Sequence, residues 1–244
     1  MQAQIIMGRA YELRKGRRAK RFDRMAKAFT RLGKEIVMAA KQGGGNIETN
    51  ARLRTAVNNA KGLNMPKDRI DAAIKRASGK DESDYEEVVF EGYGPYGIAI
   101  LVECATDNNT RTVANVRSYF TRSGGTLGKT GSLEFLFERK GVIKIDGTGL
   151  DPEELELELI DFGAEEIVKD GNEIFIYTAF VDFGTMQKEL EQRGIHVINA
   201  ETERIPNTTT TLTTEQQEEI YKLLEKFEDD DDVQAVFHNM AETE

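Results

Sequence analysis

The sequence predicts a protein of mixed α/β (α+β) class with three domains: an N-terminal three-helix bundle and two mixed α/β domains, the second ferredoxin-like and inserted in the first. Length and composition support this, because 244 residues with 39% apolar content can build several small cores. The first 80 residues carry 20 Lys and Arg against 6 Asp and Glu, whereas residues 81–244 carry 13 against 37. The hydrophobic period also changes near residue 80, from helical repeats to strands that alternate with helices.

The first helix is predicted over residues 17–41, where apolar residues recur at spacings of three and four. The glycines at 43–45 end it, because glycine readily adopts the left-handed conformation of a helix C-terminus. The opposite face of this helix is almost entirely basic. The apolar stripe consists of Phe22, Met25, Ala26, Phe29, Leu32, Ile36, Val37 and Ala40.

Two shorter helices are predicted over residues 49–62 and 66–77, each with apolar residues on one face and basic residues on the other. Pro66 suits the first turn of a helix, and Gly79 suits the end of one. Residues 1–80 are therefore expected to form a compact basic helical domain.

A surface that carries almost only positive charge suits polyanions, since ordinary protein surfaces mix both signs. We therefore expect the basic domain to bind the phosphates of nucleic acid. The alternative, that these side chains only confer solubility, applies to any single residue but less well to the whole set. The candidate nucleic-acid-binding residues are Arg14, Lys15, Arg17, Lys20, Arg21, Arg24, Lys27, Arg31, Lys34, Arg52, Arg54, Lys61, Lys67, Lys75 and Arg76.

The segment after residue 80 has the pattern strand, strand, helix, strand. Residues 98–105 form a nearly continuous apolar run after a glycine-rich turn, which predicts a central strand. A helix is predicted over 110–121, and a further strand over 133–137. A local basic patch that could add a secondary contact consists of Arg111, Arg117, Arg122 and Lys129.

From residue 141 the pattern is the β-α-β-β-α-β order of a ferredoxin-like domain. Beyond the Thr-rich connector 208–214, a capping Thr opens an amphipathic helix, and a last strand is predicted over 233–237; together they complete the first α/β domain. We therefore assign a basic helical domain to 1–80, an α/β domain to 81–139 together with 206–244, and an inserted domain to 140–205. The elements of the insertion are expected at 142–145, 152–162, 165–168, 174–178, 183–192 and 197–203.

No set of catalytic residues is recognisable. Cys104 lies in a strand predicted to be buried, where thiols are usually inert, and His196 and His238 have no Ser or Cys nearby in sequence. Residues 123–130 approach the phosphate-binding pattern G-x-x-x-x-G-K-[ST], but a helix precedes them and a strand follows, the reverse of a P-loop. We therefore expect no enzymatic activity, no cofactor and no small-molecule substrate.

One Cys and two His cannot form a disulfide or assemble a zinc site, so a reducing cytoplasm and no bound metal are expected. The aspartates at 229–232 lack the alternating ligands of an EF-hand and are expected to form a short loop before a strand. A protein partner bound through the acidic domains stays open. No apolar run is long enough for a membrane-spanning helix, so no membrane association is expected.

Short motifs follow one another along the chain: Gly-Gly-Gly-Asn at 43–46, Asn-Ala-Arg-Leu-Arg at 50–54, Asn-Met-Pro-Lys-Asp at 64–68, Glu-Gly-Tyr-Gly-Pro at 91–95 and Phe-Glu-Arg-Lys-Gly at 137–141. In this combination they closely resemble the YebC family of bacterial regulators, over essentially the whole chain from Met7. The opening differs, because residues 8–12 read Gly-Arg-Ala-Tyr-Glu where the family commonly has Gly-His-Ser-Lys-Trp. A family role for that His or Trp is therefore not transferred.

The resemblance implies a three-domain α/β fold without a catalytic centre. Members are described as transcriptional regulators that bind DNA, and related proteins, including the mitochondrial translational activator of cytochrome oxidase, act on the ribosome and ease synthesis of proline-rich stretches. We therefore expect a DNA-binding transcriptional regulator that acts through its basic helical face. The alternative is an RNA-binding translation factor associated with ribosomal RNA.

Overall fold

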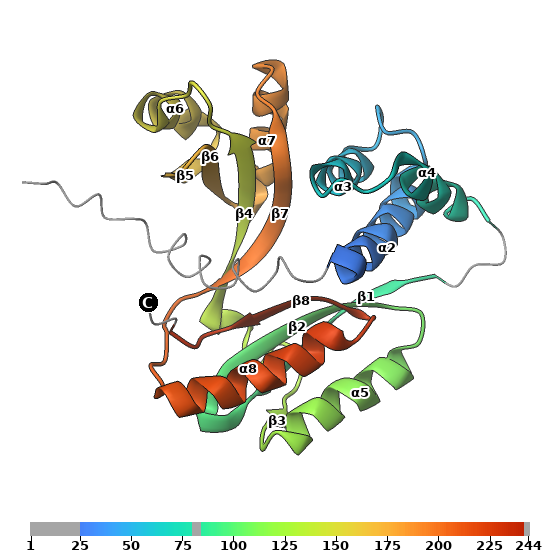
Figure 1. The fold of residues 1–244 in the computed structure, drawn as a ribbon, viewed down its shortest axis with the longest axis vertical. Helices are drawn as coiled ribbons and strands as arrows, with labels where there is room; N and C mark the ends of the chain where they lie inside the picture. Colours follow the sequence, from blue (N-terminus) through green and yellow to red (C-terminus); the bar gives the residue numbers. More distant parts are fainter. Residues whose placement is uncertain (1–24, 80–83, 242–244) are drawn as a thin grey trace, which may run out of the picture. The chain divides into compact units, whose positions relative to one another are not determined.

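The computed structural model describes residues 25–79 and 84–241. They form helices and two four-stranded antiparallel sheets, which confirms the mixed α+β class (Figure 1). The described residues divide into two compact units: the first consists of 25–79, 84–138 and 206–241, and the second of 139–205. The basic helices share the first unit with a sheet, so the finer division into three domains stays a prediction.

Three helices form the basic part of the first unit: α2 (Met25–Gly43), α3 (Ala51–Gly62) and α4 (Lys67–Arg76). They follow the apolar spacing of the sequence, because one residue from each, Ile36, Leu53 and Ile70, is buried in a shared core. The two shorter helices lie within two residues of their predicted bounds. The first helix is confirmed for the part that the structure describes.

Asn50 ties the end of α2 to the start of α3. Its Oδ1 accepts a hydrogen bond from the N–H of Leu53 (3.0 Å), and its Nδ2 donates to the carbonyl groups of Ala39 (2.7 Å) and Gly44 (2.8 Å). This packing requires glycine opposite, since a Cβ added to Gly43 would lie 2.6 Å from Nδ2 of Asn50. Gly44 continues the turn with a φ of +85°, which glycine adopts without strain. The glycine run therefore ends α2 and also makes room for the Asn50 side chain.

The sheet of the first unit contains, in spatial order, β3 (Thr126–Leu127), β1 (Glu86–Tyr93), β2 (Ala99–Thr106) and β8 (Val233–His238). Two helices, α5 (Asn109–Arg122) and α8 (Thr214–Asp229), pack on one face of it (Figure 1). Phe120 of α5 and Phe227 of α8 meet in this core with ring centroids 4.9 Å apart. The predicted central strand is β2, which is buried on both faces.

The strand predicted over residues 133–137 is wrong. Residues Glu134–Leu136 form a 3-10 helix, η2, and the next strand, β4 (Phe137–Asp146), begins only after it. A hydrogen bond to a distant residue explains this, because the N–H of Leu133 donates to the buried carboxylate of Glu91 (2.5 Å), 42 residues earlier in the chain. The strand that pairs with β1 is instead the two-residue β3.

The second unit has the predicted β-α-β-β-α-β order. The strands of its sheet lie in the order β5-β6-β4-β7, and β6 is antiparallel to both β4 and β5. This order matches the ferredoxin-like arrangement. Ile143 and Ile176 face the core beneath the two helices, whereas Phe175 and Tyr177 lie in a cluster on the other face. After β4, its elements are α6 (Pro152–Leu159), β5 (Ala164–Asp170), β6 (Glu173–Ala179), α7 (Phe183–Gln192) and β7 (Val197–Pro206).

Candidate nucleic-acid interface

The structure locates nine of the fifteen predicted nucleic-acid-binding residues. Residues 25–79 carry 11 Lys and Arg against 4 Asp and Glu, so the described helices are strongly cationic. The nine are Lys27, Arg31 and Lys34 on α2, Arg52, Arg54 and Lys61 on α3, and Lys67, Lys75 and Arg76 on α4. The predicted residues that lie outside the described parts of the chain are Arg14, Lys15, Arg17, Lys20, Arg21 and Arg24.

One face of α2 carries the residues that we call the α2 stripe: Lys27, Arg31 and Lys34. They contact the C-terminal end of α8 and the residues that follow it. Lys27 Nζ lies 2.6 Å from Oδ1 of Asp229. Arg31 Nη2 donates to the carbonyl oxygen of Glu228 at 2.9 Å. Part of the cationic surface predicted to meet nucleic acid is therefore engaged within the protein.

Lys34 makes the most enclosed of these contacts. Its ammonium group donates to Oδ1 of Asp232 (3.0 Å) and to the carbonyl oxygens of Ala105 (3.0 Å) and Asp231 (2.8 Å). These three acceptors use all three N–H groups, and the side chains of Lys34 and Asp232 are only 11% and 6% exposed. This geometry favours a structural anchor between α2 and the sheet over the predicted contact with nucleic acid.

Asp232 is the centre of the polar network that receives Lys34. Its Oδ2 accepts hydrogen bonds from Nη2 of Arg111 (2.6 Å) and from the hydroxyl groups of Thr112 (2.8 Å) and Thr106 (3.3 Å). Burial raises the pKa of Asp232, but the hydrogen bonds from Arg111, Lys34 and Thr112 outweigh it and hold the pKa below its ordinary value. No local pattern predicts this pairing, because Lys34 and Asp232 are 198 residues apart.

The neighbouring Asp230 is also part of an ordered loop. Its Oδ2 accepts hydrogen bonds from Asn115 (3.1 Å) and from the hydroxyl of Tyr119 (3.0 Å), and its Oδ1 accepts the N–H of Asp232 (2.9 Å). Burial and the bond to Asp230 raise the pKa of Tyr119 to about 12. The described residues contain no group of three or more His, Cys, Asp or Glu side chains that could hold a metal ion.

Both arginines of α3 contact other parts of the protein. Arg52 forms an ion pair with Glu87 of β1. Arg54 Nη1 donates to the carbonyl oxygens of Ile47 (3.2 Å) and Glu48 (3.0 Å), in the turn that precedes α3. Arg52 thus links the helices to the sheet, and Arg54 stabilises the turn between α2 and α3.

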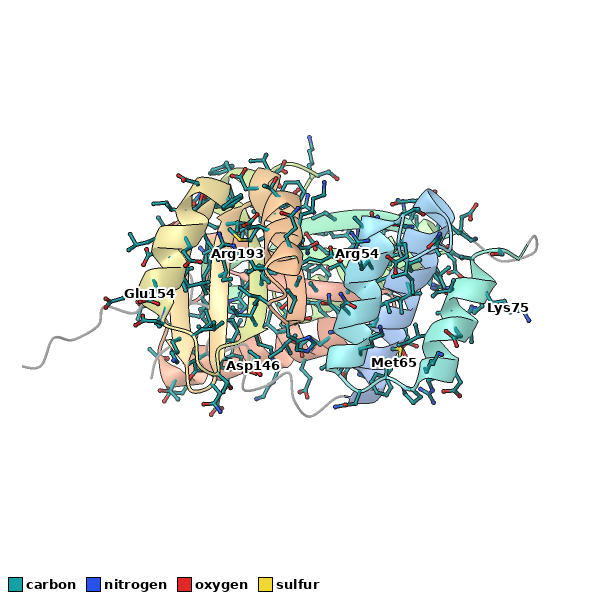
Figure 2. The ribbon with its side chains drawn as sticks, turned by 90° about the horizontal axis from the view of Figure 1, so that it is seen from above. Arg54, Met65, Lys75, Asp146, Glu154 and Arg193 are labelled. Atoms are coloured by element: carbon teal, nitrogen blue, oxygen red, sulfur yellow. The ribbon has the colours of Figure 1, made fainter. Side chains whose placement is uncertain are left out.

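Lys61, Lys67 and Lys75, the α3–α4 cations, have a different environment. All three are exposed, and within residues 25–79 and 84–241 none of them forms an ion pair. Figure 2 shows Lys75 projecting outward from α4. Arg76 is exposed on the same helix. These exposed residues of α3 and α4 are therefore the part of the predicted site that is open to a polyanion.

Two residues of the predicted local basic patch lie exposed on α5, and a third, Lys129, is exposed beyond the end of this helix. The two on α5 are Arg117 and Arg122. Arg111 is instead bound to Asp232 and to Asp107 (2.9 Å), so it belongs to the polar network. A shallow hollow of about 380 Å³ is lined by Ala114, Arg117, Ser118, Thr121 and Arg122.

Two of the features weighed for catalysis, the P-loop-like segment and Cys104, have the following surroundings. The N–H groups of Gly131 and Leu133 both donate to the carboxylate of Glu91 at 2.5 Å, so an internal anion binds the backbone that follows the P-loop-like segment. Cys104 is buried, and this burial raises its pKa to about 12, which disfavours the nucleophilic thiolate. None of the described helices has an apolar stretch long enough to cross a bilayer.

Comparison with known proteins places these features in a family. The profile of the TACO1/YebC protein N-terminal domain matches residues 9–80, and that of the TACO1/YebC second and third domain matches residues 85–240. A protein from Cytophaga hutchinsonii named "Probable transcriptional regulatory protein" is 97% identical over 238 residues, which cover 98% of this chain and 100% of the relative. A relative from Flavobacterium psychrophilum with the same description is 56% identical over 236 residues, covering 97% and 100%.

A solved structure is also similar. The crystal structure of a conserved hypothetical protein from Aquifex aeolicus matches with a TM-score of 0.80 and 36% identity, and the match covers 100% of this chain and 97% of that one. The resemblance expected from the sequence motifs is thereby confirmed. The chain belongs to the TACO1/YebC family.

Proposed function

We propose that this protein regulates gene expression by binding nucleic acid, in the first place DNA, through the outer cationic face of α3 and α4. The names of its relatives, which describe probable transcriptional regulatory proteins, support the regulatory part. The exposed α3–α4 cations support the binding part. The protein acts as a binding module and not as an enzyme, in keeping with a buried Cys104 whose thiol is held protonated.

The observation that carries this proposal is the contrast between engaged and open cations. The α2 stripe, Arg52 and Arg54 bond to acceptors of the protein, whereas Lys61, Lys67 and Lys75 present ammonium groups to solvent. Lysine is a mobile point charge on a long stem, which suits phosphate, and it lacks the rigid planar fork of donors that arginine offers. We therefore expect affinity to come mainly from phosphate contacts, with weak sequence preference.

The test compares two double variants with equal loss of charge. Lys67→Ala with Lys75→Ala removes cations from α4, and Lys188→Ala with Lys222→Ala removes exposed lysines from α7 and α8. Each phosphate contact contributes roughly eightfold to affinity at about 0.1 M salt, so the α4 variant should bind a labelled 30-base-pair duplex roughly 10- to 60-fold more weakly. The control variant should change affinity less than about twofold.

Equal loss of affinity in the two variants would refute this assignment of the binding face. The same measurements on single-stranded RNA separate the two targets. Tighter binding to RNA than to duplex DNA at matched salt would favour the translation-factor alternative and leave the cationic face in place.

A further inference from the structure

We propose that the acidic end of α8 is an internal competitor of nucleic acid for the α2 stripe, and that opening this contact exposes additional phosphate-binding cations. This inference rests on the proposed function. The competing segment is Glu228–Asp232, which supplies carboxylate and carbonyl oxygens in place of phosphate oxygens. It bonds to every member of the stripe.

The contacts combine charge with the helix terminus. The last carbonyl groups of a helix carry partial negative charge and lack partners within the helix, so they attract cations. Arg31 donates to the carbonyl of Glu228 in the last turn of α8, and Lys34 donates to the carbonyl of Asp231 just beyond it. Asp229 adds a full negative charge opposite Lys27. The stripe therefore meets a surface that resembles a short piece of polyanion.

The two ends of the stripe differ in how easily they can exchange partners. The side chains of Lys27 and Asp229 are 34% and 52% exposed, so their ion pair is weak and accessible to competing anions. Lys34 and Asp232 are almost enclosed and share further hydrogen bonds with Arg111 and Thr112. Competition should therefore act at Lys27 and Arg31, while Lys34 keeps the helices attached to the sheet.

The experiment removes the competitor without removing a cation. Asp229→Asn in the full-length chain deletes the charge opposite Lys27, and Glu218→Gln deletes the same charge from an exposed site on the same helix. Binding of both variants to the labelled 30-base-pair duplex is measured by fluorescence anisotropy over a range of salt concentrations. A third variant carries Asp229→Asn together with Lys27→Ala, and Lys27→Ala alone is its reference.

Release of one cation should raise the affinity of Asp229→Asn up to about eightfold at about 0.1 M salt and steepen the salt slope by about 0.9. Glu218→Gln should change affinity less than about twofold, and Asp229→Asn should have no effect in the Lys27→Ala background. Equal affinities of Asp229→Asn and Glu218→Gln would refute the competitor, as would the same gain with and without Lys27. Absence of binding in the wild type and all variants would instead refute the proposed function, and this inference with it.

Discussion

The Lys34–Asp232 contact makes a quantitative prediction about stability. Lys34→Met keeps the length of the side chain but removes the ammonium group, which leaves Asp232 buried with one donor fewer. Loss of one partner of a buried ion pair typically costs about 3–5 kcal/mol. Since Arg111 and Thr112 still donate to the carboxylate, we expect the lower part of that range or slightly less, about 2–3 kcal/mol.

Lys27→Met is the matched control, because it removes the same group from the same face of the same helix. Its partner Asp229 is half exposed, so the expected loss is below about 1 kcal/mol. Urea unfolding followed by circular dichroism measures both free energies of unfolding. The two variants can be compared if the dependence of the unfolding free energy on urea concentration, the m-value, stays the same. Equal destabilisation of the two variants would refute the assignment of Lys34 as the buried anchor.

Three further predictions concern stability and reactivity. Asn50→Ala should lower the free energy of unfolding by about 2 kcal/mol, because it removes the N-cap and two hydrogen bonds to the end of α2. Asn58→Ala, on the exposed face of α3, should cost less than about 0.5 kcal/mol in the same urea-unfolding measurement, and similar values for the two variants would contradict the role of Asn50. Because the pKa of Asp232 is lowered on folding, its ionisation stabilises the protein above the ordinary value of 3.8, and this stability is lost as the pH falls through the folded-state pKa. The difference in unfolding free energy between the wild type and Asp232→Asn should therefore be constant above about pH 5 and shrink below about pH 4. A difference that grows on acidification would contradict the lowered pKa of Asp232 in the folded protein. Cys104, buried and with its pKa raised to about 12, should not react with a thiol reagent at about pH 8 until the protein is unfolded, and rapid reaction of the native protein would show that the strand opens.

Helices and strand order can be predicted from the sequence where local signals and the pattern of buried residues agree. The spacing of apolar residues located the helices. A capping Thr is expected to open the helix after the Thr-rich connector, and in the structure Thr213 begins α8 with a capping box to Gln216. The ferredoxin-like strand order followed from the alternation of elements in residues 142–203. These features depend on residues close together in the chain.

The failures come from contacts between distant segments. Residues 133–137 have the apolar pattern of a strand, yet the bond from Leu133 to Glu91 engages their backbone and leaves a 3-10 helix. The helical wheel placed Lys34 with the nucleic-acid contacts, because it showed only that Lys34 lies opposite the apolar stripe. Tertiary packing decides which polar residues of a helix are covered by another element. Lys34 is covered because it bonds to Asp232, which is 198 residues away in the chain.

The salt dependence of binding tests the central claim most directly. If the four exposed cations of α3 and α4 displace counterions from phosphates, the logarithm of affinity should fall with the logarithm of salt concentration at a slope of about −3.6 on duplex DNA and about −2.8 on single-stranded RNA. Titration of the full-length protein from low to moderate salt on both nucleic acids gives the slopes. A nearly flat dependence on both would contradict phosphate binding by the basic helices, and would leave their exposed lysines as solubilising groups or as a surface for a protein partner.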